Sequence, residues 1–295
     1  MPLVELQNGP SQWGDIKDAA DILLKASVYP NVNMLGAELQ RHYNNYGLFA
    51  LNLRPGVNTN RRAVLVCNGE KITIAFEGST PDEAHQDNWV NAKGPGWWEL
   101  DHPIYDRENR VHSFYHQNWR RMQWSTCDAL NRAVDFICHR GDQPKQIVIV
   151  GYSQGGGVST FADIDIVEHI RNTWGTQSIG PQEWTKEESL GSLVQHLTVA
   201  AIGAADQGYY TTLNDFYGQY QIRAWDFMST SDTSLHTHFN EFRAWRGYHY
   251  ILPRVIAGQF DNDFGAQGHG ILGYFRVAEW MAENKSDQVR SEYNY

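Results

Sequence analysis

Ser153 lies in a stretch whose residue types could form a nucleophile. Residues 147–153 read Ile-Val-Ile-Val-Gly-Tyr-Ser and continue as Gln and three glycines. The apolar run is typical of a buried strand, and helical spacing begins after the glycines. Glycines stand two positions before and after the serine, where side chains would collide with the strand and the helix. The stretch predicts a nucleophile elbow, the sharp turn that exposes a serine hydroxyl at the carboxyl edge of a sheet.

A second chemistry for the same turn is weaker. Glycine-rich turns at a helix start also hold phosphate, but no Gly-Lys-Ser or Gly-Lys-Thr follows here. An ordinary glycine-rich turn in another α/β protein is the plainer alternative. If Ser153 is a nucleophile, two donors must bind the developing oxyanion. The backbone N–H groups of Gln154 and Ser79 are the candidates, and Ser79 could instead be a turn residue that caps a helix.

A nucleophilic serine needs a base and a carboxylate that holds this base. In the elbow arrangement the chain order is Ser, then Asp or Glu, then His. Asp226 lies within the strand-like stretch 221–229, whereas Asp232 follows it, where loops carry functional groups. We therefore favour Asp232 and keep Asp226 as the alternative.

Four histidines follow Asp232 as candidates for the base. His236 and His238 come too soon after Asp232 to belong to a separate loop. His269 lies in Ala-Gln-Gly-His-Gly, a glycine-flanked loop just before a helical pattern, and is the favoured base. His249 is the alternative.

The elements that must position these residues alternate between helices and short apolar strands. Helical spacing is clear at 14–29, 113–140, 156–172 and 268–284, and strand-like runs occupy 146–150, 193–205 and 221–229. Two further strand-like runs within 63–76 meet at Asn68-Gly69, a strong hairpin signal. We expect one α/β domain over residues 1–295, with a mostly parallel central sheet covered by helices on both faces.

Composition narrows the function classes. The 295 residues are 41% hydrophobic and carry a net charge of −10, which argues against a nucleic-acid partner. Three cysteines cannot make a disulfide framework, and we expect reduced thiols and no metal site. Residues 1–15 resemble no signal peptide, and no stretch is long and apolar enough to span a membrane. We expect a cytoplasmic protein, or one exported by a route that needs no signal peptide.

Several segments in order resemble the class 3 (fungal-type) lipases of the α/β-hydrolase superfamily. They are ITIAFEGS, with Glu77 in place of the family's Arg, and then DNWVNAK, VHSFYHQNW, MSTSDTSL and GHGILGYF, the last carrying His269 followed by a Tyr. The resemblance spans about residues 60–275 and implies a triad of Ser153, Asp232 and His269. The elbow Gly-Tyr-Ser-Gln-Gly is more similar to that of a cutinase. AAIGAADQG departs from the family's Gly-x-Pro-Arg-x-Gly, and residues 175–192 are interpreted as an insertion.

Residues 79–98 would then form a lid over the serine. Trp89 and Val90 give this segment an apolar face, and with Tyr152 they are the expected lid and pocket residues. A rigid aromatic loop is the alternative, because three acidic residues lie in the same segment.

The sequence thus predicts a cofactor-free serine ester hydrolase, of the lipase, phospholipase or esterase type, that acts on a lipid or other ester, with a lipid–water interface as a partner. A small-ester or cutinase-like esterase is the nearest alternative. A catalytically silent hydrolase-fold binding protein and an acyltransferase are the others.

Overall fold

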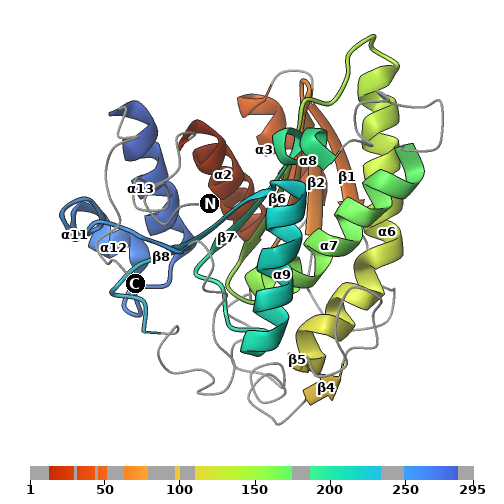
Figure 1. Cartoon of the computed structure of the whole chain (residues 1–295). Helices are drawn as coiled ribbons and strands as arrows, with labels where there is room; N and C mark the ends of the chain where they lie inside the picture. The colour runs from red at the N-terminus through yellow and green to blue at the C-terminus, as the bar shows by residue number, and fades with distance from the viewer. Residues whose placement is uncertain are drawn as a thin grey trace.

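The computed structural model describes residues 13–29, 32–43, 46–51, 63–78, 97–99, 110–174, 187–233 and 249–284 (Figure 1). The expected lid core, with Ser79, Trp89 and Val90, lies outside these ranges. So do residues 175–186 of the expected insertion, whose last part forms helix α8 (Glu187–Leu193). The single domain over 1–295 stays a prediction. None of the helices within the described ranges is long and apolar enough to cross a membrane.

The described strands build a central sheet in the order β1-β2-β3-β6-β7-β8-β9. These strands are Tyr46–Leu51, Ala63–Asn68, Lys71–Phe76, Gln146–Tyr152, Val194–Val199, Arg223–Met228 and His249–Ile251. From β3 to β9 every neighbouring pair is parallel, and only β1, β2 and β3 pair antiparallel. A small separate sheet pairs β4 (Trp97–Glu99) with β5 (Arg110–His112). The predicted mostly parallel sheet is confirmed.

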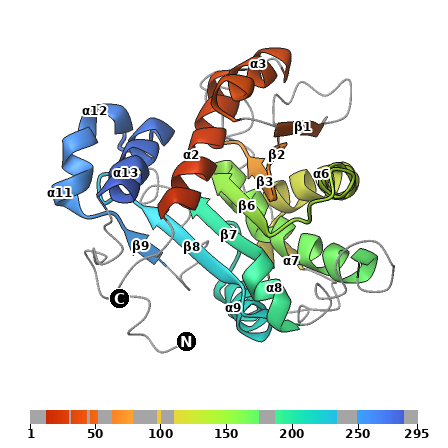
Figure 2. The same ribbon diagram turned by 90° about the horizontal axis from the view of Figure 1, so that it is seen from above.

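Helices cover both faces of this sheet (Figure 2). One face carries α2 (Trp13–Val28), α3 (Val32–His42), α13 (Ile271–Glu283) and the short turns α11 (Arg254–Ala257), η2 (Gly258–Phe260) and α12 (Asp261–Phe264). The other face carries α6 (Ser113–Cys138), α7 (Gln154–Trp174), α8 and α9 (Gln207–Tyr220). The four predicted helical segments correspond to α2, α6, α7 and α13.

Two hydrophobic cores, one on each face of the sheet, explain why β6 is continuously apolar. Along β6, Ile147 and Ile149 point into the core beneath α6, α7 and α9, whereas Val148 and Val150 point into the core beneath α2 and α13. Successive side chains of a strand face opposite sides of a sheet. A strand covered on both faces is therefore mostly apolar, which is the pattern that β6 shows.

Two strand boundaries differ from the prediction. The hairpin turn is Gly69-Glu70, because Asn68 pairs with Lys71 and Gly69 has a φ of 62°. The strand expected over 193–205 ends at Val199, because Ala200 takes a φ of 50° and its N–H bonds the carbonyl of Phe227. Polarity alone could not locate this second boundary, since the residues after Val199 are also small and apolar.

Candidate active site at the carboxyl edge of the sheet

Ser153 occupies a sharp turn between the end of β6 and the start of α7. Its φ of 53° lies in the left-handed region, which a residue with a Cβ adopts at a cost. Its N–H bonds the carbonyl of Val199 at the end of the neighbouring strand, 3.0 Å away. This is the elbow conformation that the glycine pattern predicts.

The flanking glycines are required by close backbone contacts. A Cβ on Gly151 would lie 2.3 Å from the carbonyl oxygen of Gly155, and a Cβ on Gly155 would lie 2.1 Å from that of Phe76. Both obstacles are backbone atoms that cannot move aside as a side chain can. The expected collisions two positions either side of the serine are confirmed.

His269 reaches Ser153 from the loop between α12 and α13. Its Nε2 lies 2.8 Å from Ser153 Oγ, and its Nδ1 lies 2.7 Å from Asp232 Oδ2. An ionised carboxylate only accepts hydrogen bonds, so Nδ1 carries the proton and Nε2 is free to accept from the serine hydroxyl. Thus the three residues favoured from the sequence meet in one hydrogen-bonded chain.

Asp232 is fully buried just past the end of β8. Its N–H bonds the carbonyl of Ser229, and the hydroxyl of Tyr274 donates to its Oδ2 at 3.2 Å. The same hydroxyl accepts the N–H of Ser229. Burial raises the pKa of Tyr274 well above its ordinary value, so the phenol remains a donor. Tyr274 was assigned no role from the sequence, although its place five residues after His269 was visible.

The loops that carry Asp232 and His269 are joined to each other. The N–H of Thr233 bonds the carbonyl of Gln267 at 3.0 Å. Gly268 has a φ of 67°, and a Cβ there would lie 2.0 Å from the carbonyl oxygen of Ser231. Glycine at this position is thus required both by its conformation and by the close approach of the two loops.

The expected oxyanion donors are placed in part. Gln154 is the first residue of α7, so its N–H has no acceptor within the helix. Ser79 lies outside the described ranges, but its neighbour Gly78 lies beside the elbow. A Cβ on Gly78 would be 3.1 Å from Ser153 Cβ and 2.6 Å from the ring of Tyr152.

The alternative triad residues lie elsewhere. Asp226 is a fully buried residue within β8, and its Oδ1 accepts the hydroxyl of Thr198 at 2.6 Å. His249 is the first residue of β9, where its backbone pairs in register with Asp226. His236 and His238 lie outside the described ranges.

A second serine–histidine pair lies in the core, and no motif in the sequence predicts it. His196 on β7 has Nε2 2.9 Å from Ser159 Oγ and Nδ1 2.7 Å from the hydroxyl of Tyr217. Ser159 directs its own hydroxyl proton to the carbonyl of Gly156. His196 is 1% exposed, and burial lowers its pKa to about 3. The imidazole is therefore neutral and has no access to solvent.

Asp163 on α7 is a second buried ionisable group near this pair. Neither carboxyl oxygen reaches hydrogen-bond geometry with a described residue. Burial raises its pKa to about 7, opposed in part by the nearby hydroxyl of Tyr217. Asp163 is thus protonated over much of the mildly acidic range.

A metal site and a reactive thiol each place requirements on the described residues. No group of three or more His, Cys, Asp or Glu side chains in this part of the chain could hold a metal ion. Cys67, Cys127 and Cys138 are free. Burial raises the pKa of the Cys67 and Cys127 thiols to about 12, which keeps both protonated and weakly reactive.

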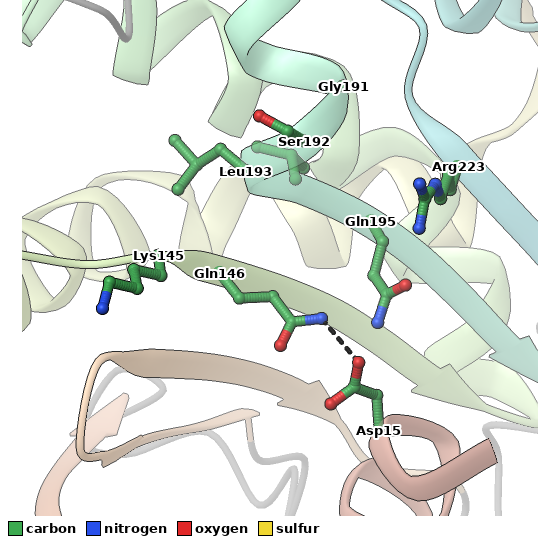
Figure 3. Close-up of a pocket in the computed structure, with 9 residues that line it drawn as sticks. Asp15, Lys145, Gln146, Gly191, Ser192, Leu193, Gln195 and Arg223 are labelled. Carbon is green, nitrogen blue, oxygen red and sulfur yellow. Dashed lines mark hydrogen bonds between the residues drawn. The ribbon is translucent and has the colours of Figure 1, made fainter. Parts of the chain in front are cut away.

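A polar hollow of about 250 Å³ lies at the opposite, amino-terminal edge of the sheet (Figure 3). Asp15 there bonds Gln146 and Lys71, while Lys145 pairs with Glu70. None of the predicted site residues lines it. Because Gln146 begins β6 and Ser153 follows its end, the hollow is separate from the candidate site.

Comparison with solved structures gives the same fold in triacylglycerol lipases. The Rhizomucor miehei lipase, in a propeptide complex, is 13% identical with a TM-score of 0.54, and the match covers 90% of this chain and 78% of that one. The lipase of Rhizopus microsporus var. chinensis is 9% identical with a TM-score of 0.55, and the match covers 83% of this chain and 76% of that one. The triacylglycerol lipase of Penicillium expansum is 12% identical with a TM-score of 0.52, and the match covers 81% of this chain and 79% of that one. No protein-family model and no curated protein matches the sequence. At these identities the likeness establishes the fold: the chain has an α/β-hydrolase-type fold shared with fungal triacylglycerol lipases.

Proposed function

We propose that the chain is a serine ester hydrolase that cleaves carboxylic esters of lipids through an acyl-enzyme on Ser153. One observation carries the proposal. His269 bonds Ser153 Oγ through one ring nitrogen and the buried carboxylate of Asp232 through the other, at 2.8 and 2.7 Å. This is the geometry that a serine needs in order to lose its proton as it attacks.

In the first half-reaction Ser153 Oγ attacks the ester carbonyl carbon, and His269 Nε2 takes the hydroxyl proton. Asp232 stabilises the imidazolium that forms and does not itself take up the proton. The tetrahedral intermediate collapses when the C–O bond to the alcohol breaks, and His269 returns the proton to the leaving alcohol. In the second half-reaction a water molecule attacks the acyl carbon while His269 takes its proton. The C–O bond to Ser153 then breaks, His269 returns the proton to Ser153 Oγ, and the acid is released.

The oxyanion of the intermediate needs fixed donors. The N–H of Gln154 is the first donor, and its position at the start of α7 supports this role. We assign the second to the N–H of Ser79, supported by the place of its neighbour Gly78, where an added Cβ would lie 3.1 Å from Ser153 Cβ. The reaction requires no cofactor.

The substrate class is proposed from the fold and the sequence together. One of the similar structures, 14% identical with a TM-score of 0.54, is described as a triacylglycerol lipase with a serine protease triad as its catalytic centre. This supports lipid esters as substrates here and a relationship to class 3 lipases. The cutinase-like elbow and the lid over 79–98, with Trp89 and Val90, are proposed from the sequence alone. Tyr152 stays a proposed pocket residue.

The proposal is tested by hydrolysis of p-nitrophenyl esters from short to long acyl chains, with wild type and Ser153→Ala in parallel. We expect turnover by wild type only, with a preference for longer chains. A preference for short chains would favour the small-ester esterase. Absence of turnover in both proteins would contradict the hydrolase and favour the catalytically silent binding protein.

A further inference from the structure

Tyr152 connects the elbow to the histidine loop. It is the last residue of β6, next to Ser153, and its hydroxyl donates to the carbonyl of His269 at 2.6 Å. The phenol group therefore holds the main chain at the residue from which the imidazole extends.

The Tyr152 ring has little freedom to move. It lies against the imidazole of His269 with ring centroids 5.3 Å apart and an angle of 31° between the planes, and it is 9% exposed. On another side it contacts Gly78, where a Cβ would lie 2.6 Å from the ring. Burial raises the pKa of Tyr152 well above its ordinary value, so the hydroxyl keeps its proton and can donate.

From this geometry we infer that Tyr152 is a positioning residue for His269, and this inference rests on the proposed function. Asp232 fixes Nδ1 of the imidazole, and the hydrogen bond of Thr233 with Gln267 fixes the loop two residues before His269. Tyr152 fixes the main chain at His269 itself. Since a misplacement on the order of 1 Å can cost a large part of the rate, loss of this hold should lower kcat.

The matched pair of variants is Tyr152→Phe and Tyr209→Phe. Tyr209 is also buried, and its hydroxyl also donates to a backbone carbonyl, that of Thr160, at 3.0 Å. It lies on α9 in the core beneath α7, away from the triad. Each variant thus removes one buried hydroxyl bond and keeps the ring, so a general effect on stability should be similar in both.

We expect Tyr152→Phe to lower kcat for ester hydrolysis about fivefold to tenfold with KM unchanged, and Tyr209→Phe to leave both unchanged. The low-field proton resonance of the His269–Asp232 hydrogen bond should broaden or shift in Tyr152→Phe only. This resonance reports the position of the imidazole and does not depend on turnover.

Equal kcat values in the two variants, with an unchanged resonance in Tyr152→Phe, would overturn the inference. Failure of the proposed function is distinct, because wild type would then hydrolyse no ester. The resonance would still decide whether Tyr152 positions His269.

Discussion

The described part of the chain contains two serine–histidine pairs, and they differ in three respects. His269 contacts Ser153 and the carboxylate of Asp232, and 17% of its side chain is exposed. His196 contacts Ser159 and a phenol, and is sealed in the core. Ser159 also gives its proton to a helix carbonyl.

The direction of the protons separates a reactive pair from a structural one. In the elbow, the carboxylate forces the proton onto Nδ1, so Nε2 must accept from the serine. In the core, the Ser159 hydroxyl donates to the carbonyl of Gly156. His196 Nε2 must therefore carry the ring proton and donate it to Ser159 Oγ, while Nδ1 accepts from the Tyr217 hydroxyl. A serine–histidine contact therefore indicates a nucleophile only when an acid sets the tautomer and the pair is accessible to a substrate.

The largest effect that separates the pairs is expected from their serines. Ser153→Ala should lower kcat for ester hydrolysis by about 10⁴-fold or more, because it removes the nucleophile. Ser159→Ala should retain most of the wild-type kcat and lose about 1 kcal/mol of unfolding free energy. Steady-state kinetics and urea unfolding of both variants check this, and a larger kinetic loss in Ser159→Ala would reverse the assignment.

The next effect concerns the acid. Asp232→Asn should reduce kcat on the order of 10⁴-fold while the protein stays folded, because an amide can stabilise the wrong tautomer of His269. Asp226→Asn is the matched control, since its remaining oxygen can still accept the Thr198 hydroxyl. Similar kinetic losses in the two variants would argue against Asp232 as the residue that holds the base.

Removal of the core imidazole should affect stability and leave the kinetics intact. His196→Leu removes the imidazole that bonds the hydroxyls of Ser159 and Tyr217 in the buried core, at a cost of roughly 2–4 kcal/mol. Activity per folded molecule should not change. Urea unfolding combined with active-site titration measures both quantities, and a normal midpoint with lost activity would be the contradictory result.

The smallest effect is a pH dependence near the core pair. The pKa of Asp163 is about 7 in the folded protein against an ordinary 3.8, so the folded state holds a proton that the unfolded chain releases between these values. Its stabilising contribution is complete below about pH 4 and is lost as pH rises to 7. The pKa of His196, about 3 against 6.5, acts oppositely, and its contribution is lost as pH falls below 6.5.

Asp163→Asn isolates the contribution of Asp163 to the pH dependence of the unfolding free energy. Between pH 4 and pH 7, the unfolding free energy of the variant should gain on that of wild type by about 1.4 kcal/mol per pH unit. Chemical unfolding at several pH values gives this difference directly. Parallel curves for the two proteins would mean that Asp163 does not titrate as proposed.

Much of the candidate site could be read from local sequence. The elbow requires glycine at fixed offsets, and the loop at Gly268 requires glycine for its conformation, so Ser153 and His269 carried local signals. Asp232 followed from chain order and from its place after a strand. The fold class followed from strands that are apolar on both faces.

Other features depend on contacts between distant parts of the chain. The hydroxyl of Tyr152 meets His269 across 117 residues, and that of Tyr274 meets Asp232 across 42. The His196 network joins a strand to two helices. No spacing in the sequence encodes such pairings, because they depend on how helices pack on the sheet. The roles proposed for Ser79, Trp89 and Val90 stay predictions.

The most direct test of the central claim is reaction with an alkyl fluorophosphonate followed by peptide mass spectrometry. We expect one phosphonylated residue, Ser153, with no labelling of Ser159. Labelling should disappear in Ser153→Ala and slow strongly in Asp232→Asn. Absence of label on Ser153 in the folded wild-type protein, or label on Ser159, would contradict the assignment of the elbow serine as the nucleophile.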